Sequence, residues 1–403
     1  MKKILLLILL TLLTSQTNFA QWVQQTSGTI GDLNSVYFVN SQTGWVCGVT
    51  GPVSTDRIAK TTDGGITWVR QNAGTFYVLN SIQFINDQTG WAAGIHGTVV
   101  KTTNAGAVWL NVFGTTSFDF NDVQFIDSQT GWVSSSQVSG IYKTTDSGLN
   151  WSYLFYQYSF RDIHFMNTNN GWGINLGLNS QIMKSTNGGV NWSNTGVPNI
   201  ALLSIYFIDN FTGWTGGAND SVPERGKMLK TIDSGNNWSL INLDTNTYPR
   251  SVYFVNNFIG WFSGSSGKIF KSFNGGINWF RQNSGVTTEL RDIFFIDSSN
   301  GWSVGENGVI LKTTNGGGSV GINLISTEIP SEFNLYQNYP NPFNGSSKIK
   351  FEISKLGDAK IVVYDVLGRE IETLVKSLLQ PGTYEIIFEA KDLSSGIYFY
   401  RLV

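Results

Sequence analysis

Polar residues recur at one position of a pattern that runs through most of this sequence, and their types suit anion binding. The position that opens the first strand of each repeat holds three asparagines, three arginines and one leucine: Asn34, Asn80, Asn121, Arg161, Leu203, Arg250 and Arg291. Guanidinium groups bind carboxylates through paired hydrogen bonds, so a ring of such residues predicts an anion- or carboxylate-binding mouth. The alternative is structural, with the arginines paired to Asp162, Asp292 or backbone carbonyls at a repeat edge.

Length variation concentrates at one hairpin of the repeat, which favours a binding role for the same end of the molecule. The span from a Gly-Trp tryptophan to the lysine that opens the next Lys-Ser/Thr-x-Asp/Asn turn is 10–12 residues in five repeats, but 15 in the first (Trp45–Lys60) and 16 in the fifth (Trp214–Lys230). Arg57 and Arg225 lie in the longer spans. Because loops on a rigid scaffold often carry binding residues, we expect a protein or glycan ligand between these hairpins and the arginines.

A second recurrent motif, Ser/Thr-x-Asp/Asn-x-Gly-x-x-Trp, invites a metal or catalytic interpretation that its residue types do not favour. Its third position is acidic in three repeats and an amide in four: Asp63, Asn104, Asp146, Asn187, Asp233, Asn274 and Asn315. Asparagine keeps the hydrogen-bond acceptor and loses the charge, so the position needs an acceptor for backbone N–H groups of the turn. We interpret these residues as structural and expect the face that carries them to be inert.

The composition argues against most catalytic and metal sites. One cysteine, Cys47, excludes an intramolecular disulfide, and two histidines exclude a His-rich metal centre, so we expect no metal and no cofactor. A glycosidase needs two carboxylates at defined separation, but Asp122, Asp162 and Asp292 share a repeat position with serines and suit inner-strand hydrogen bonding. A net charge of −2 argues against nucleic-acid binding. We expect a non-enzymatic binding protein; the alternative is a glycan-active hydrolase.

The elements that must position these residues follow from the repeat. Gly-Trp recurs seven times at intervals of 40–47 residues, and each repeat supports four short strands separated by turn signals. The seventh repeat lacks its second tryptophan, while Trp22 lies in a segment that matches the missing strand. We therefore predict an all-β fold: a seven-bladed β-propeller over residues 21–321, with the N-terminal strand closing the last blade.

The two ends of the chain differ from the repeat region. Residues 1–20 combine a basic start with a short apolar run, which is typical of a secretory signal peptide, and no later segment is apolar enough to span a membrane. After a linker at residues 322–330, tryptophan disappears and alternating strands predict a small Ig-like β-sandwich over residues 331–403. We expect a monomer that is secreted or held at the outer-membrane surface.

The motifs resemble those of known families. The turn motif is the Asp-box of bacterial neuraminidase repeats, sortilin-type receptors and some xyloglucanases, and KTTDGGITW with the Gly-Trp element more closely resembles the photosystem II assembly and stability factor family. That resemblance implies a seven-bladed propeller and offers a photosystem chaperone as a further alternative. FNLYQNYPNPFN and VYDVLGREI resemble the type IX secretion sorting domain of Bacteroidota-like bacteria, which implies that machinery as a partner. Such domains usually continue past this point, so we expect a truncated last strand.

Overall fold

The structure is a computed structural model that describes the chain from Trp22 to Val403 with several gaps. The residues that it does not describe are 1–21, 50–54, 115, 137–139, 156–157, 177–179, 197–199, 219–225, 244–246, 318–322, 344–345, 390–392 and 394. The predicted signal peptide and Arg225 therefore lie outside the described residues.

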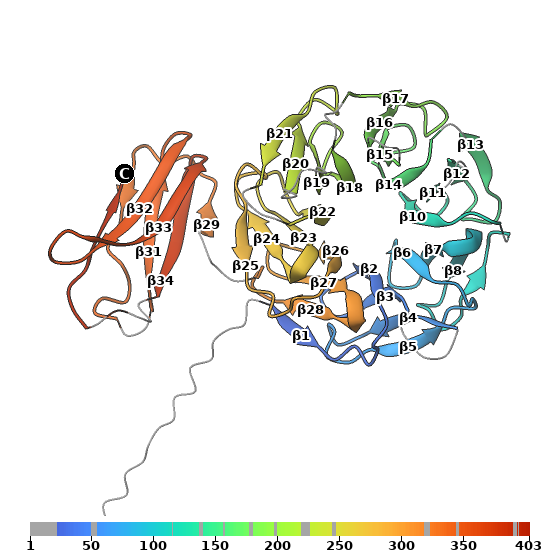
Figure 1. Cartoon of the computed structure of the whole chain (residues 1–403), viewed down its shortest axis with the longest axis horizontal. Helices are drawn as coiled ribbons and strands as arrows, with labels where there is room; N and C mark the ends of the chain where they lie inside the picture. Colours follow the sequence, from blue (N-terminus) through green and yellow to red (C-terminus); the bar gives the residue numbers. More distant parts are fainter. Residues whose placement is uncertain are drawn as a thin grey trace, which may run out of the picture.

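Seven antiparallel four-stranded sheets follow one another around a ring between Trp22 and Gly317 (Figure 1). We refer to them as blades 1 to 7, with the first strand of each blade innermost. The strands are β2 (Leu33–Phe38), β3 (Gly44–Gly48), β4 (Asp56–Thr61) and β5 (Val69–Asn72) in blade 1; β6 (Leu79–Phe84), β7 (Gly90–Gly94), β8 (Val99–Thr102) and β9 (Leu110–Asn111) in blade 2; β10 (Phe120–Phe125), β11 (Gly131–Ser135), β12 (Ile141–Thr144) and β13 (Ser152–Phe155) in blade 3; β14 (Phe160–Phe165), β15 (Gly171–Asn175), β16 (Gln181–Ser185) and β17 (Ser193–Asn194) in blade 4; β18 (Ala201–Phe207), β19 (Gly213–Ala218), β20 (Gly226–Thr231) and β21 (Ser239–Asn242) in blade 5; β22 (Pro249–Phe254), β23 (Gly260–Gly264), β24 (Ile269–Ser272) and β25 (Phe280–Gln282) in blade 6; and β26 (Leu290–Phe295), β27 (Gly301–Gly305), β28 (Ile310–Thr313) and β1 (Val23–Gln25) in blade 7. The all-β prediction is confirmed.

The N-terminal strand completes blade 7, as the displaced tryptophan predicts. β1 pairs antiparallel with β28, with Val23 opposite Lys312 and Gln25 opposite Ile310. Trp22 is buried, its indole Nε1 donates a hydrogen bond of 2.9 Å to Gln282 Oε1, and its ring meets Phe295 edge to face. The two ends of the repeat array are thus joined without a covalent link.

The Gly-Trp element recurs because it builds the contact between neighbouring blades. Each Gly-Trp tryptophan stacks on the last phenylalanine of the next inner strand, and the pairs are Trp45–Phe84, Trp91–Phe125, Trp132–Phe165, Trp172–Phe207, Trp214–Phe254, Trp261–Phe295 and Trp302–Phe38. A Cβ on Gly44 would lie 2.5 Å from the Phe38 ring, which explains the glycine. The Trp302–Phe38 pair, 3.5 Å between ring centroids, closes the circle.

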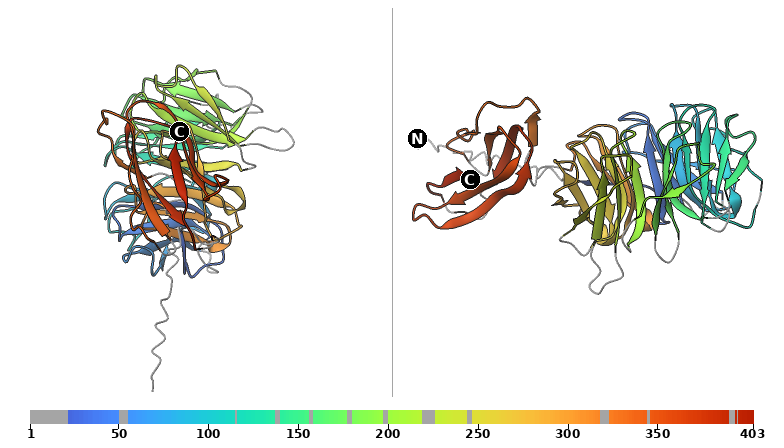
Figure 2. Two further views of the ribbon diagram at one scale, coloured as in Figure 1. Left: turned by 90° about the vertical axis from the view of Figure 1, so that its left-hand side faces the viewer. Right: turned by 90° about the horizontal axis from the view of Figure 1, so that it is seen from above.

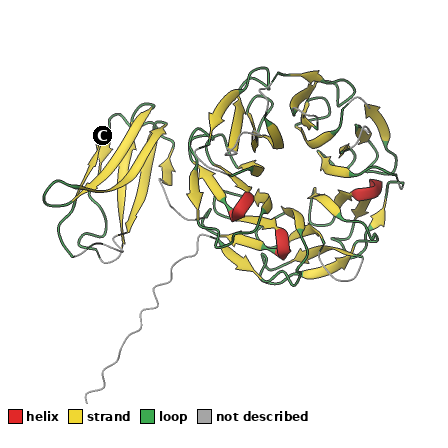
Figure 3. Cartoon of the chain, viewed as in Figure 1, coloured by secondary structure: helices red, strands yellow, loops and turns green. Residues whose placement is uncertain are grey.

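Regular helices are absent from the described residues. Three 3-10 turns, η1 (Ile95–Gly97), η2 (Ser265–Gly267) and η3 (Glu306–Gly308), each connect the second and third strands of a blade (Figure 3). Seen edge-on, the ring is a short cylinder, with the blade loops on its two faces (Figure 2). The described part of the chain holds no helix with the length and hydropathy needed to cross a membrane.

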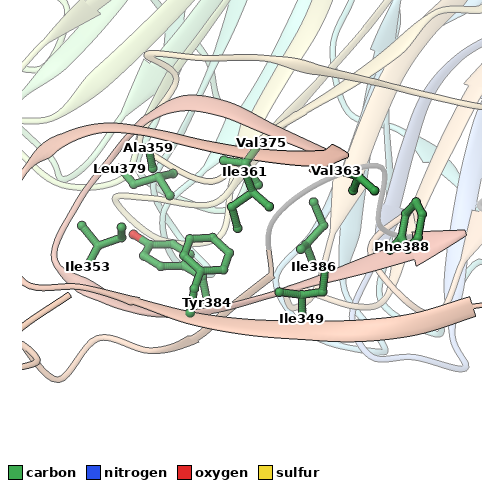
Figure 4. Packing of buried hydrophobic residues seen from close by; sticks show 11 residues of the cluster. Ile349, Ile353, Ala359, Ile361, Val363, Val375, Leu379, Tyr384, Ile386 and Phe388 are labelled. Carbon is green, nitrogen blue, oxygen red and sulfur yellow. The ribbon is translucent and has the colours of Figure 1, made fainter. Parts of the chain in front are cut away.

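The C-terminal region forms a two-sheet sandwich with a core of its own. One sheet has the order β29 (Asn323–Ser326), β34 (Gly382–Glu389), β31 (Ser346–Ile353), β30 (Asn334–Leu335); the other has the order β33 (Glu370–Leu379), β32 (Gly357–Tyr364), β35 (Phe399–Leu402). Buried side chains from both sheets, including Ile349, Ile361 and Tyr384, pack between them (Figure 4). The expected linker at 322–330 contains β29, which pairs with β34.

Candidate functional site

A β-bulge at the start of every inner strand creates the candidate site. The pairing register shifts across one residue in each blade, for example between Leu33 and Ser35 in β2 and between Phe160 and Asp162 in β14. The residues skipped by the shift are Asn34, Asn80, Asn121, Arg161, Leu203, Arg250 and Arg291. A bulge redirects the extra side chain, so two consecutive residues of each strand face the centre of the ring.

These bulge residues line one cavity of about 620 Å³ at the centre of the ring. All six ligand-binding candidates that the sequence places on the inner strands therefore lie together. The complete lining is Asn34, Ser35, Asn80, Ser81, Asn121, Asp122, Ser136, Arg161, Asp162, Leu176, Leu203, Ser204, Arg250, Ser251, Glu289, Arg291 and Asp292. A cavity of this size and polarity accommodates a charged peptide side chain or a sugar.

The residue after each bulge forms a second ring, which joins the blades. Each of these side chains accepts a backbone N–H from the next inner strand, at 2.7–3.4 Å: Ser35 from Ile82, Ser81 from Val123, Asp122 from Ile163, Asp162 from Ile205, Ser204 from Val252, Ser251 from Ile293 and Asp292 from Val36. The prediction that the aspartates of this ring form inner-strand hydrogen bonds is confirmed. The bond from Val36 to Asp292 links blade 1 to blade 7.

Two aspartates of this second ring share a hydrogen bond. Asp122 and Asp162 stand on neighbouring blades, and their carboxyl groups are hydrogen-bonded to each other. Burial raises the pKa of Asp162 well above its usual range, and the negative charge of Asp122 raises it further. Burial also raises the pKa of Asp122, although hydrogen bonds from Ser81 and Asp162 oppose the rise. One proton between two carboxyl groups is the arrangement that this proximity favours.

Two of the three arginines already hold carboxylates. Arg250 Nη2 donates to Glu289 Oε2 at 2.8 Å, and Arg291 Nη2 lies 2.9 Å from Asp32 Oδ2 and 3.3 Å from Glu306 Oε1. The structural alternative expected partners in Asp162, Asp292 or backbone carbonyls, and these two arginines pair with other carboxylates instead. Both aspartates instead accept hydrogen bonds from the backbone of the next blade. The carboxylates that hold the arginines are Asp32 and Glu289, which precede inner strands, and Glu306 in η3.

Arg161 differs from the other two arginines because it has no hydrogen bond or ion pair among the described residues. Burial lowers its pKa, and the charge of Arg250 lowers it further, while Asp162 and Glu289 act in the opposite direction. Leu176 and Leu203 line the same cavity. Among the described residues, Arg161 therefore presents a guanidinium without a direct carboxylate partner to a pocket with a partly apolar wall.

A third level of the inner strands is mostly aromatic. Its residues are Tyr37, Gln83, Gln124, His164, Tyr206, Tyr253 and Phe294. Neighbours contact one another across blades, with ring centroids 4.8 Å apart for Tyr37–Phe294 and 4.9 Å for Tyr206–Tyr253. Burial lowers the pKa of His164 to about 4, so this imidazole is neutral at physiological pH. None of these residues lines the cavity, so the cavity lies at the end of the channel where the inner strands begin.

The predicted hairpin residue Arg57 is not part of the described cavity. Arg57 lies on β4, the third strand of its blade, and its guanidinium donates to the backbone carbonyl of Phe76 at 2.7 Å. A third-strand residue is two strands away from the channel, which explains why Arg57 does not line it. Arg225 and most of both long hairpins fall outside the described residues.

The sequence-based list omitted residues that the structure brings to the mouth. Asp32 and Glu289 precede inner strands, Glu306 belongs to η3, and Ser136 and Leu176 follow second strands. The repeat position of Asp32 and Glu289 is acidic in one further repeat, at Asp119, and in none of the other four, so periodicity carries only a weak signal for it. Ser136, Leu176 and Glu306 share a variable repeat position that carries none. Their position next to bulge residues is apparent only once the blades are closed into a ring.

The Asp-box residues act as acceptors within their own turns, as predicted. Asp63 Oδ1 accepts the backbone N–H of Thr67 at 2.9 Å, and Asn104 Oδ1 accepts that of Val108 at 2.9 Å, so charge makes no difference to the geometry. Asp146, Asn187, Asp233 and Asn274 make the same bond, and Asn315 accepts from the hydroxyl of Thr313. The described residues contain no group of three or more side chains able to hold a metal ion.

Comparison with solved structures finds propellers of the same fold. The chain matches "YCF48 from Cyanidioschyzon merolae" with a TM-score of 0.60 and 20% identity, covering 72% of this chain and 98% of that one. It matches "YCF48 bound to D1 peptide" with a TM-score of 0.59 and 19% identity, covering 73% and 96%. The extracellular domain of the putative one component system BT4673 from B. thetaiotaomicron matches with a TM-score of 0.54 and 13% identity, covering 95% and 56%. No curated protein matches the sequence.

Two family models account for most of the chain. The secretion system C-terminal sorting domain matches residues 337–403, which identifies the sandwich as a type IX secretion tail and makes the protein secreted or cell-surface. The model of photosynthesis system II assembly factor YCF48 matches residues 14–155, 153–279 and 230–338. With its Gly-Trp and Asp-box repeats closed into a ring of four-stranded blades, the chain belongs to the YCF48-like family of propellers.

Proposed function

We propose that this propeller is a non-enzymatic binding module that captures an acidic group of a protein or glycan partner outside the cell. The observation that carries the proposal is Arg161, a guanidinium without an ionic partner among the described residues, in a cavity of about 620 Å³. Arg250 and Arg291, already paired with carboxylates, shape the opposite wall. The sorting tail supplies the location, because it directs the protein through the type IX machinery.

A peptide is the first ligand class to test. One solved propeller of this family is described as bound to D1 peptide, and the fold likeness is the reason to examine peptides before sugars. The wall formed by Leu176 and Leu203 suits an apolar side chain next to the acidic group. A role in photosystem assembly is less favoured, because a type IX tail sends the chain outside the cell.

Hydrolysis of glycans is less favoured by the arrangement of carboxyl groups. Retaining glycosidases hold two carboxyl groups about 5–5.5 Å apart and inverting ones about 6.5–9.5 Å apart. In the cavity, Asp122 and Asp162 are in direct hydrogen-bond contact, and Glu289 is paired with Arg250. Both aspartates also accept backbone N–H groups that hold the blades together. We therefore assign binding, with hydrolysis as an outcome that reducing-sugar release measures directly.

The proposal is tested by presenting the chain without its signal sequence to peptide and glycan arrays. We expect binding to an acidic member, and Arg161→Gln should weaken that binding by about tenfold or more. Arg281→Gln, an exposed arginine on the outer strand β25, is the matched control and should bind like the wild type. Equal binding by Arg161→Gln and the wild type, or sugar release without retained binding, would contradict the assignment.

A further inference from the structure

The acid pair lies directly beside Arg161, which has no ion pair among the described residues. Arg161 and Asp162 are consecutive residues of β14, and the bulge turns both toward the cavity. Asp162 Oδ2 is held at 2.7 Å by the N–H of Ile205, and Asp122 Oδ2 at 3.4 Å by the N–H of Ile163. Backbone bonds on both sides fix the two carboxyl groups in contact.

The groups that face this pair come from each neighbouring blade. Ser81 Oγ on β6 donates to Asp122 Oδ1 at 2.7 Å, and Ser204 on β18 is hydrogen-bonded to Asp162. On β14 itself, Arg161 is the charged neighbour and His164 is neutral above about pH 4. Across the cavity, Arg250 and Glu289 act on Arg161 with opposite signs. The pair thus provides a titratable charge close to Arg161.

We propose that the proton held between Asp122 and Asp162 regulates anion binding at Arg161, an inference that rests on the proposed binding site. With the proton present, the pair carries one negative charge and Arg161 is free to hold an external anion. When the proton leaves, a second negative charge appears next to the guanidinium. Arg161 is then compensated internally, and the external anion is repelled.

The sign of the coupling follows from linkage. A raised pKa places the titration of the pair above the ordinary range of aspartate, so binding is strong below that titration and weakens as the pH rises through it. Coupling is reciprocal: an anion bound at Arg161 stabilises the proton and raises the pKa of the pair. Binding therefore takes up protons from solution.

Sulfate is the probe for this coupling, because its charge is constant across the range of interest. Its affinity is measured on the full propeller and tail, from side-chain N–H signals of Arg161 in NMR spectra at about pH 5 and about pH 9. We expect the wild type to bind sulfate about tenfold more weakly at the higher pH, the change that one added neighbouring charge produces. Asp162→Asn should bind equally at both, because its amide donates to Asp122 as the protonated acid does.

Two matched variants separate the failure of this inference from failure of the binding site. In Asp292→Asn the change is at the equivalent ring position, next to Arg291, where the carboxyl group is hydrogen-bonded to Ser251 and Ser35. This variant should keep the pH dependence of sulfate binding that the wild type shows. Arg161→Gln should abolish sulfate binding at both pH values. Wild-type protein that binds no sulfate at low pH would overturn the binding site itself. Binding that is independent of pH, or that stays pH-dependent in Asp162→Asn, would overturn the proton coupling alone.

A measurement on the wild type covers the case in which Asp162→Asn does not fold. Carbon-13 labelling of aspartate carboxyl groups follows the titration of the pair with and without sulfate. We expect one of the two carboxyl signals to titrate above the ordinary aspartate range, and sulfate to shift it to higher pH. A titration that sulfate leaves unchanged would overturn the coupling.

Discussion

At the residue scale, the lysines before the Asp-box turns show how one repeat position tolerates different environments. Six of the seven lie over the Gly-Trp tryptophan of their own blade, with Nζ 5.0–5.8 Å from the ring centroid. Lys271 is the buried one, because Phe273 replaces the threonine or isoleucine of the other repeats and stands 4.9 Å from the same Nζ. Burial lowers the pKa of Lys271 to about 8.

The Lys271→Met variant is expected to be more stable than the wild type at neutral pH. The lowered pKa means that the folded state binds the proton less tightly than the unfolded state, so wild-type stability should rise as pH increases from about 8 to about 10.4. Methionine removes the buried charge, and we expect a gain of about 1–2 kcal/mol after the lost ring contact is counted. Urea denaturation at a series of pH values measures both effects. Lys60→Met, at a partly exposed lysine, is the control and should change little.

At the element scale, the closing strand determines whether the ring holds together. β1 contributes three paired residues to β28, and Trp22 anchors it between Gln282 and Phe295. Without this strand, blade 7 would present an open edge of unpaired backbone groups, which favours aggregation. The stacked pair Trp302–Phe38 and the bond from Val36 to Asp292 are the other contacts across the same seam.

Trp22→Ala should destabilise the propeller by about 3–5 kcal/mol, because it removes a buried indole together with its hydrogen bond. Trp68→Ala is the matched control: Trp68 occupies the equivalent position in blade 1, is only partly buried, and its Nε1 has no hydrogen-bond partner. We expect a smaller loss for the control and no increase in aggregation. Thermal melting with light scattering compares the two. Equal losses would show that the seam has no special role in stability.

At the scale of the whole molecule, the propeller and the sandwich have separate hydrophobic cores. The sandwich core contains residues between Leu335 and Leu402, while the propeller clusters lie between Trp22 and Leu311. Figure 1 shows the two as distinct bodies. Because each buries its own apolar surface, each has what an independent folding unit needs.

Limited proteolysis should release two stable fragments by cutting between β28, which ends at Thr313, and β29, which begins at Asn323. β29 pairs with β34, so cuts after Asn323 would remove an edge strand and should be slower. Calorimetry of the intact chain should show two transitions, each matched by one fragment. A single transition, together with resistance to cleavage before Asn323, would contradict the division into two units.

The candidate site was only partly predictable, and particular residues show why. Arg161, Arg250 and Arg291 were found because they occupy one repeat position, which requires no knowledge of three-dimensional contacts. Their difference in pairing was not found, since the repeat position of Glu289 is acidic in only three repeats and that of Glu306 is acidic in no other repeat. Asp162 was recognised as a hydrogen-bonding residue, but its contact with Asp122 joins neighbouring blades. Repeat alignment groups equivalent residues and does not measure distances between them.

By itself, the sequence determined the all-β repeat, its closure by the displaced Trp22, the acceptor role of the Asp-box position and the sorting tail. These features depend on local turn chemistry and on periodicity, both of which are written along the chain. Only the tertiary structure decided that a β-bulge directs two residues of each inner strand toward one shared cavity. It also decided that Arg161 makes no ion pair with any residue that the structure describes, and that it lies beside Asp162 and Asp122. Such contacts join residues about 40 positions apart, for example Asp122 and Ile163, and they exist only once the ring has closed.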